Sequence, residues 1–274
     1  MQVDQLFDIK GKTAVITGAT GVLGNEMARE MARRGAKVAV MSTTRERADK
    51  LAEEIKNQGG IAIGLAANVL DKESLIQARS GVMEAFGRID ILVNGAGGND
   101  KAATVSPDFS FFDIPADALE WVFNLNILGT IQATQVFGEV MVKQGKGSVI
   151  NISSMNSYRP LTNIVAYSAA KAGINNFTQW MAVHFNQNYS PDIRVNAIAP
   201  GFFHTKQNHF LLVDEKTGEP TPRARQILGH TPMNRYGVPQ DLLGTLIWLA
   251  SDASAFVNGV VVPVDGGFSA FSGV

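Results

Sequence analysis

Short apolar runs alternate along the chain with longer segments in which apolar and polar residues mix. Seven runs have the length and composition of buried strands, at residues 13–17, 38–41, 61–65, 89–93, 148–152, 193–198 and 260–264. Helical composition lies between them, at residues 25–34, 45–57, 72–86, 116–144, around 167–171 and at 242–250. Strands that alternate with helices form parallel sheets covered on both faces. The pattern predicts one α/β domain over residues 1–274 with a doubly wound, parallel, seven-stranded sheet.

Small and polar residues fall where several predicted strands end. Gly18, Asn94, Ser154 and Pro200 are all in such positions. The carboxyl ends of parallel strands meet at one edge of the sheet, and ligands bind beyond that edge. We therefore expect these four residues to line one crevice.

A glycine-rich turn joins the first predicted strand to the first predicted helix, at residues 18–24. Glycines let the backbone approach a pyrophosphate, and a helix N-terminus attracts its charge with free N–H groups and the helix dipole. A glycine cluster alone is common in turns, but this placement is typical of a dinucleotide site. The sheet is therefore expected to be of the Rossmann type.

Tyr167 and Lys171 are four residues apart, which places them on one face of a helix. A phenol ordinarily titrates near pH ~10, and a neighbouring ammonium favours the phenolate and lowers that pKa. The pair would then transfer protons near neutrality, although such pairs also occur on solvated helix faces. Ser154 lies thirteen residues earlier. It could share a substrate oxygen with the phenol, or simply cap a turn.

On these motifs the chain resembles a classical short-chain dehydrogenase/reductase, from about Lys10 to the C-terminus. The matching motifs are residues 17–24, 94–97, Asn126 within 125–130, Ser154, Tyr167 with Lys171, Pro200-Gly201 with Thr205, and 264–267. The family's usual turn has its middle glycine where this chain has Val22, so Gly21 is expected to take part of that role.

The resemblance implies a division of work among four catalytic residues. Tyr167 would be the general acid/base, Lys171 would lower its pKa and hold the nicotinamide ribose, and Ser154 would orient the substrate oxygen. Asn126 would hold a water that relays protons from Lys171, the alternative being a helix kink or cap. The expected cofactor-binding set is Gly18, Thr20, Gly21, Val22, Leu23, Gly24, Ser42, Thr43, Thr44, Arg45, Asn68, Val69, Asn94, Gly95, Ala96, Gly97, Tyr167, Lys171, Pro200, Gly201, Phe203 and Thr205.

Cofactor choice depends on the residues after the second strand. An acidic residue there binds a ribose 2′-hydroxyl and selects NAD, whereas an arginine accommodates a 2′-phosphate. This chain has Ser42 at the acidic position, followed by Thr43, Thr44 and Arg45. Three hydroxyls and a guanidinium favour NADP(H) over NAD(H). Alternatively, Thr44 caps the next helix and Arg45 is solvated.

Finer similarity points to a substrate class. Residues 153–162, 175–185, 199–203 and 262–274 resemble the short-chain-type D-mannonate oxidoreductases, also called fructuronate reductases, although Ser42 departs from the aspartate of that branch. The expected reaction is hydride transfer between nicotinamide and a sugar acid. The alternatives are a reductase of the gluconate 5-dehydrogenase or 3-oxoacyl thioester type, and a non-catalytic dinucleotide-binding sensor.

A long excursion, about residues 202–238, carries many polar and basic residues and is expected to close over the substrate as a lid. A carboxylate needs a fixed cation or several amide donors. Arg159 is the first candidate, because it follows Ser154 closely. The expected substrate-binding set is Ser154, Asn156, Arg159, Tyr167, Lys206 and Gln207, with Arg223 as a further cation.

Composition excludes several other classes. The net charge is −1, so no basic field points to nucleic acid or anionic lipid. The chain has no cysteine, which excludes disulfides but does not fix the compartment. It has no apolar run of 18 residues and no signal-peptide core, so a soluble cytoplasmic protein is expected. Four histidines at 184, 204, 209 and 230 lack ligand spacing, so no metal is expected. The resemblance implies a homotetramer.

Overall fold

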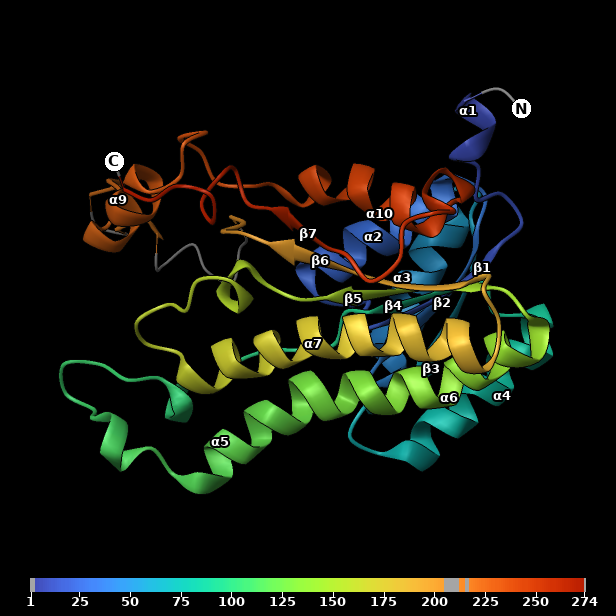
Figure 1. The fold of residues 1–274 in the computed structure, drawn as a ribbon, viewed down its shortest axis with the longest axis horizontal. Coiled ribbons are helices and arrows are strands. Elements are labelled where there is room, and N and C mark those ends of the chain that lie inside the picture. The colour runs from blue at the N-terminus through green and yellow to red at the C-terminus, as the bar shows by residue number, and fades with distance from the viewer. Residues whose placement is uncertain (1–2, 205–211, 215–216, 274) are drawn as a thin grey trace.

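Seven parallel strands form one sheet in this computed structural model, which describes residues 3–204, 212–214 and 217–273 (Figure 1). The strand order is β3-β2-β1-β4-β5-β6-β7. All six pairings between neighbouring strands are parallel. The strands are β1 (Thr13–Thr17), β2 (Lys37–Ser42), β3 (Ile61–Ala66), β4 (Ile91–Asn94), β5 (Gly147–Ile152), β6 (Ile193–Pro200) and β7 (Val261–Val264). The predicted single α/β domain with a seven-stranded Rossmann-type sheet is confirmed.

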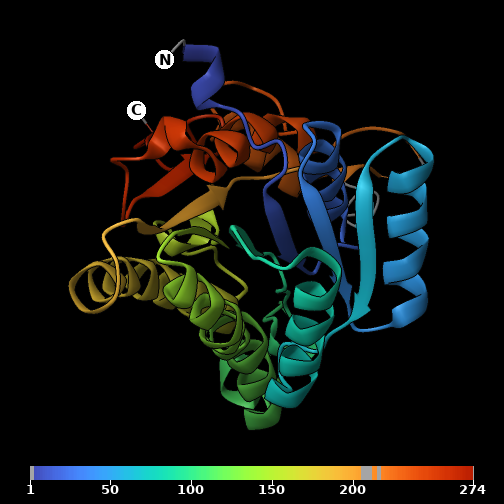
Figure 2. The same cartoon turned by 90° about the vertical axis from the view of Figure 1, so that its right-hand side faces the viewer.

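Helices cover both faces of the sheet (Figures 1 and 2). One face carries α2 (Val22–Arg33), α3 (Arg45–Asn57) and α10 (Leu243–Ala250), and the other carries α4 (Lys72–Phe86), α6 (Gly129–Gln144) and α7 (Val165–Asn188). The remaining α-helices of the described chain are α1 (Val3–Leu6), α5 (Ala116–Phe123) and α9 (Pro222–Gly229). The chain enters β2 after β1 and later returns to β4 on the other side of β1, which creates a crevice at the carboxyl ends.

Local sequence sets the helix ends. Asp71 caps α4, because its carboxylate accepts hydrogen bonds from the N–H groups of Glu73 and Ser74. Gly87 ends the same helix with a φ of 75°, a left-handed conformation that glycine adopts without a steric cost. Gly145 ends α6 in the same way, with a φ of 74°. These caps fix where the chain turns back toward the sheet.

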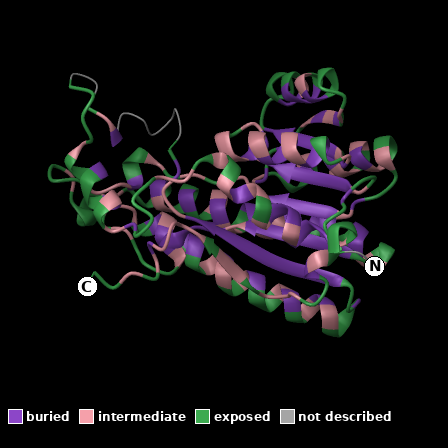
Figure 3. Ribbon diagram, turned by 90° about the horizontal axis from the view of Figure 1, so that it is seen from above, coloured by how far each residue is buried: buried purple, intermediate pink, exposed green. Residues whose placement is uncertain are grey.

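The core lies on both sides of the strands, which are mostly buried (Figure 3). All five residues of β1 are buried, and successive side chains face opposite ways. Ile16 packs with α2, α3 and α10, whereas Val15 packs with α4, α6 and α7. Phe137 on α6 is fully buried in the second cluster. The continuous apolar runs in the sequence therefore reflect strands covered on both faces.

The predicted helix over 116–144 is interrupted. A π-helical segment, η3 (Asn124–Leu128), separates α5 from α6. The Asn126 side chain lies within this segment and donates a 2.8 Å hydrogen bond from Nδ2 to the carbonyl of Val122. A side-chain amide that bonds the preceding turn competes with regular helical geometry, and π segments often mark functional sites. The sequence-based alternative of a kink at Asn126 is thus present in the structure.

Candidate active site

A cavity of about 350 Å³ opens at the carboxyl ends of the strands. It lies where the strand order reverses beside β1, as expected for a ligand site in this kind of sheet. Glycine turns from three connections and the polar residues of α7 meet here. Its lining is Gly18, Gly21, Val22, Leu23, Gly24, Gly95, Gly97, Gly98, Ile152, Ser153, Ser154, Tyr167, Lys171, Pro200, Gly201, Phe202 and Phe203.

The turn between β1 and α2 leaves no room for side chains at two glycines. A Cβ on Gly24 would lie 2.4 Å from the carbonyl oxygen of Gly18, and a Cβ on Gly18 would lie 2.8 Å from the backbone of Ala96. Gly18 also has a φ of 65°. The backbones at Gly18, Gly24 and Ala96 therefore approach one another closely, and the turn after β4 packs against the turn after β1.

The N-terminus of α2 faces this cavity without a side-chain cap. Gly21 is the N-cap residue, with a φ of −72°, and no side chain bonds the first N–H groups. Val22, at the position where the family's middle glycine was expected, is the first helical residue and lines the cavity. Uncapped N–H groups and the helix dipole suit a pyrophosphate. The cradle therefore fits a dinucleotide.

Ser154 both caps a turn and contacts the tyrosine. Its hydroxyl accepts a 3.3 Å hydrogen bond from the N–H of Asn156, which starts the short helix η4 (Met155–Ser157). The same hydroxyl lies close enough to the phenol of Tyr167 on α7 to lower its pKa. The two interpretations of Ser154 made from the sequence are thus compatible. Ser154 follows the end of β5, and Tyr167 lies in the first turn of α7.

Lys171 lies one helical turn after Tyr167 and is buried. Its Nζ donates a 2.8 Å hydrogen bond to the carbonyl of Ile152 and lies 5.4 Å from the centre of the Tyr167 ring. Burial lowers the pKa of Lys171 from its ordinary value to about 8. Burial also raises the pKa of Tyr167, and the neighbouring hydroxyl of Ser154 only partly opposes this shift. In the protein alone the tyrosine pKa therefore lies above its ordinary value, because desolvation dominates, and the lowering expected from Lys171 stays a prediction.

Asn126 lies between Lys171 and the turn that follows β4. Its Oδ1 accepts a 3.2 Å bond from the N–H of Gly98, and its Nδ2 donates a 2.7 Å bond to the carbonyl of the same glycine. A Cβ on Gly97 would lie 2.7 Å from this Oδ1 and 3.1 Å from the Lys171 Nζ. Gly97 therefore allows the amide and the ammonium to approach each other. The amide also holds the turn after β4, while the water relay stays a prediction.

The end of β2 carries hydroxyls rather than a carboxylate. Thr20 donates a 3.0 Å hydrogen bond to the hydroxyl of Ser42, which links the glycine turn to this strand. Thr43 and Thr44 are exposed, and Thr44 makes no side-chain cap for α3. Arg45 is also exposed but bonds both carboxylate oxygens of Asp49, at 2.8 and 2.7 Å. An NADP phosphate would have to compete with Asp49 for this guanidinium.

Two expected cofactor residues have side chains that point into the core. Asn94 bonds Thr134 at 3.0 Å and Asn151 at 2.8 Å, both from Nδ2, and does not line the cavity. The Val69 side chain is buried against Gly129. Asn68 is exposed, and its Oδ1 accepts a 3.0 Å bond from the N–H of Leu70. For Asn94 and Val69, the strand-end position was read correctly, but side-chain contact with a cofactor is not supported.

Of the expected substrate residues that the structure describes, Ser154 and Tyr167 line the cavity, whereas Asn156 and Arg159 do not. Asn156 is buried, and its Oδ1 has no hydrogen-bond partner among the described residues. Arg159 is exposed outside the cavity lining, with no ion pair to any described residue. Thr205, Lys206 and Gln207 lie outside the described residues. Arg223 is exposed on α9, within the part of the excursion that the structure describes.

Sequence reasoning missed some of the lining. Gly98, Ile152, Ser153 and Phe202 line the cavity but were not assigned a role. All four lie at or just after the end of a strand, so position at a strand end was the available signal. Within the described ranges, no three His, Asp or Glu residues gather as a metal site would require. None of the described helices is long and apolar enough to cross a membrane.

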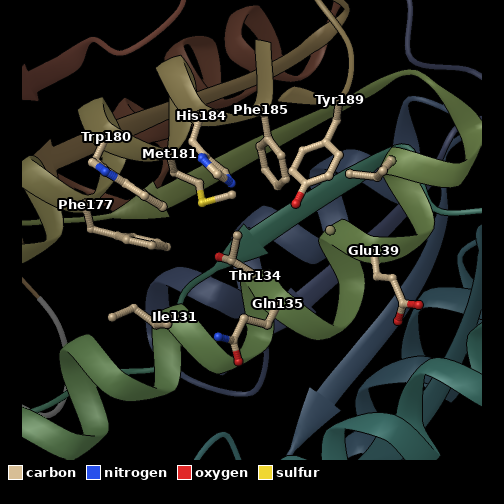
Figure 4. A pocket seen from close by; sticks show the side chains of 12 residues that line it. Ile131, Thr134, Gln135, Glu139, Phe177, Trp180, Met181, His184, Phe185 and Tyr189 are labelled. Atoms are coloured by element: carbon tan, nitrogen blue, oxygen red, sulfur yellow. The ribbon is translucent and has the colours of Figure 1, made fainter. Parts of the chain in front are cut away.

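A second, apolar groove of about 390 Å³ lies between α6 and α7, away from the glycine turns (Figure 4). Trp180 and His184 stack at 4.6 Å, and Phe185 and Tyr189 continue the row along α7. Figure 4 shows these rings facing Ile131, Thr134 and Gln135 of α6. Trp180 is 57 % exposed, so much of its ring contacts no part of the described chain.

Comparison with known proteins agrees with this geometry. The family model for short chain dehydrogenase matches residues 12–216. The uncharacterized oxidoreductase UxuB of Bacillus subtilis (strain 168) is 50 % identical over 97 % of this chain and 98 % of its own length.

Two solved structures are also similar. A Haemophilus influenzae protein with the provisional name D-mannonate oxidoreductase, solved with bound NAD, has a TM-score of 0.92 at 48 % identity, covering 97 % of this chain and 98 % of that one. A gluconate 5-dehydrogenase from Burkholderia cenocepacia J2315, in complex with NADP and tartrate, has a TM-score of 0.87 at 30 % identity, covering 98 % and 100 %. With its uncapped glycine turn and its serine, tyrosine and lysine at one cavity, the chain belongs to the short-chain dehydrogenase family of NAD(P)-dependent oxidoreductases.

Proposed function

We propose that this protein interconverts a hexonate and a keto-hexuronate, D-mannonate and D-fructuronate. The observation that carries the proposal is the meeting of Ser154, Tyr167 and Lys171 in one cavity beside a dinucleotide cradle. The provisional name of the Haemophilus influenzae relative supports this substrate. The gluconate 5-dehydrogenase relative, solved with tartrate, supports a sugar acid more broadly and makes gluconate-type substrates the second candidate.

Side chains of the protein carry out the proton transfer. Ser154 and Tyr167 lie beside each other in the cavity lining, so both hydroxyls can bond one substrate oxygen. Burial raises the pKa of Tyr167, so the phenol is protonated at neutral pH and can donate to a carbonyl. Lys171, when charged, favours the phenolate that remains. A bound nicotinamide supplies the hydride chemistry, and the residues that would hold it line the cradle from Gly18 to Gly24 and include Lys171.

The substrate carboxylate is assigned to Arg159. This exposed arginine lies five residues after Ser154 and has no ion pair to a described residue that would compete for it. A guanidinium binds a carboxylate with two parallel hydrogen bonds. The excursion over about 202–238, with its basic helix α9, would close over the bound acid.

Cofactor preference is proposed to be for NADP(H). Ser42, Thr43 and Thr44 offer hydroxyls at the end of β2, and Arg45 follows them. No carboxylate stands in the sequence from 41 to 45 to repel a 2′-phosphate. The Haemophilus influenzae relative was solved with NAD, so the proposal concerns preference and not exclusive use.

Self-association into a homotetramer is proposed through the groove between α6 and α7. Trp180 and Val183 are 57 % and 56 % exposed on α7, and the groove beside them is lined mainly by apolar side chains. An exposed apolar surface next to such a groove favours contact with a second copy of the same surface.

The Tyr167→Phe variant tests the chemistry. Removing the hydroxyl should lower kcat for D-fructuronate reduction by about 10²–10⁴-fold, because the proton donor is lost. Cofactor affinity, measured by fluorescence titration, should stay within about twofold, since the ring remains. Near-normal turnover would refute the proposed role. Cofactor binding in the wild type without turnover of D-fructuronate, 5-ketogluconate or an acetoacetyl thioester would favour the sensor alternative.

The Arg159→Ala variant tests the substrate class. Loss of a charge-assisted contact should raise KM for D-fructuronate by about 10–100-fold, while KM for the neutral ketose D-fructose should hardly change. Arg159→Lys keeps the charge, and its KM for D-fructuronate should lie between the values for the wild type and for Arg159→Ala. Equal effects on the acid and the neutral ketose would reject the assignment of Arg159.

Cofactor preference is tested at Arg45 and Ser42. Arg45→Ala should lower the ratio of kcat/KM for NADPH over NADH by about 10-fold or more, because a charged hydrogen bond to the phosphate is lost. Ser42→Asp should favour NADH through repulsion of the phosphate. Arg47→Ala, at an exposed position two residues on, is the matched control and should leave the ratio unchanged. A wild-type ratio in both test variants contradicts the preference proposed here.

Sedimentation velocity tests the interface. Trp180→Asp places a charge at the groove between α6 and α7 and should convert tetramers into smaller species at micromolar concentration. Phe256→Asp, a change at a fully exposed aromatic residue outside the groove, should leave the tetramer intact. Tetramers in both variants would locate the interface elsewhere.

A further inference from the structure

Helix α7 presents three residues, spaced four apart, to the segment that follows β5. The phenol of Tyr167 lies beside the hydroxyl of Ser154, and the Lys171 Nζ donates to the carbonyl of Ile152. Asn175 comes one turn later on the same face. The catalytic proposal uses the first two contacts and leaves the third without a role.

Asn175 makes two hydrogen bonds that bracket Ser154. Its Oδ1 accepts a 2.6 Å bond from the hydroxyl of Ser153, and its Nδ2 donates a 2.8 Å bond to the hydroxyl of Ser157. Ser157 in turn donates a 2.5 Å bond to the carbonyl of Ser154. One amide therefore ties the residue before Ser154 and the helical turn after it to α7.

The hydrogen bonds of the Asn175 amide hold Ser153 and Ser154 against α7. Ser153 is buried, and its hydroxyl also reaches the carbonyl of Lys171 at 3.3 Å, so the serine pair is held against the turn of α7 that carries the lysine. Residues 158–160, beyond Ser157, are exposed, and the Tyr158 hydroxyl donates a 2.9 Å hydrogen bond to the carbonyl of Val261 on β7. Without Asn175, the short helix η4 would lose its side-chain hydrogen bond to α7 and keep only its own cap from Ser154 and the contact of Tyr158 with β7. The position of Ser154 relative to the phenol would then be less well defined.

We propose that Asn175 is a positioning residue for the oxidoreductase reaction. It fixes Ser154 at the distance from Tyr167 at which both hydroxyls bond the same substrate oxygen. Neither the cofactor cradle nor the candidate carboxylate site includes Asn175. Misplacement of a reacting group by about 1 Å costs on the order of 10²-fold in rate. The inference rests on the proposed roles of Ser154 and Tyr167, but it does not depend on which carbonyl compound is reduced.

Steady-state kinetics with D-fructuronate, or with whichever of the tested carbonyl compounds the wild type reduces, separates positioning from general stability. Asn175→Ala should lower kcat by about 10–100-fold while KM for the cofactor stays within twofold, because only the serine segment loosens. Ser157→Ala removes the other end of the same series of hydrogen bonds and should also lower kcat. The double variant should be no worse than the more affected single variant, since both changes break one connection.

Asn176→Ala is the matched control, because it removes the same side chain from the adjacent, exposed position of α7. It should retain wild-type kcat. Equal kcat for Asn175→Ala, Ser157→Ala and the wild type would overturn the proposal, as would fully multiplicative effects in the double variant. If Asn175→Ala does not fold, the Ser157→Ala and Ser153→Ala variants carry the test, because each loses only a hydroxyl.

Failure of the catalytic proposal gives a different pattern. Full activity in Tyr167→Phe would remove the proposed chemistry whatever the Asn175 variants do. Inactive Tyr167→Phe and Ser154→Ala variants together with a fully active Asn175→Ala variant would leave the chemistry standing and reject the positioning role alone.

Discussion

The buried ammonium of Lys171 is the constraint on which the site depends. It lies 3 % exposed at the carboxyl ends of β4 and β5, and it donates a hydrogen bond to the carbonyl of Ile152 rather than to a carboxylate. A pKa lowered from 10.5 to about 8 corresponds to a stability cost on the order of 3 kcal/mol at neutral pH. The unfolded chain binds the proton more tightly, so this cost is present in full below pH 8 and is relieved as pH rises toward 10.5. The fold therefore holds the charge in place against its own stability, as expected for a functional group.

Polar side chains in the core help the structure to tolerate this cost. Asn94 bonds Thr134 on α6 and Asn151 on β5, and Asn151 donates a 2.9 Å bond to Thr178 on α7. These contacts cross from the central strands to the two helices that bracket the catalytic segment. Buried hydrogen bonds of this kind specify one arrangement of the elements they join, although the Oδ1 of Asn94 has no partner among the described residues. Helix α7 is thus held to the sheet at Thr178, and the Tyr167, Lys171 and Asn175 face is held to the segment after β5.

Periodicity predicted the sheet, the helices and the common edge at which the site lies, because buried parallel strands have a simple apolar pattern. Family resemblance added the roles of Ser154, Tyr167 and Lys171. The direction of the Tyr167 pKa was not predictable, since it depends on desolvation, which spacing does not report. The inward direction of Asn94 and the π segment at Asn126 depend on contacts between distant elements. The contacts of Asn175 were not predicted for the same reason, because its partners Ser153 and Ser157 lie about twenty residues earlier in the chain.

Burial shifts the pKa values of the two ionisable groups of the site in opposite directions. The pKa of Tyr167 rises and that of Lys171 falls to about 8, so at neutral pH the protein alone holds a protonated phenol beside an ammonium. A protonated phenol can donate to a carbonyl at once, whereas alcohol oxidation needs the phenolate. The phenolate is costly here unless Lys171 stays charged and the hydroxyl of Ser154 donates to it. The arrangement of charge therefore favours reduction at neutral pH. As pH rises in the protein alone, Lys171 loses its charge near pH 8, before the phenol of Tyr167 loses its proton, so the phenolate that oxidation needs forms without the stabilising ammonium.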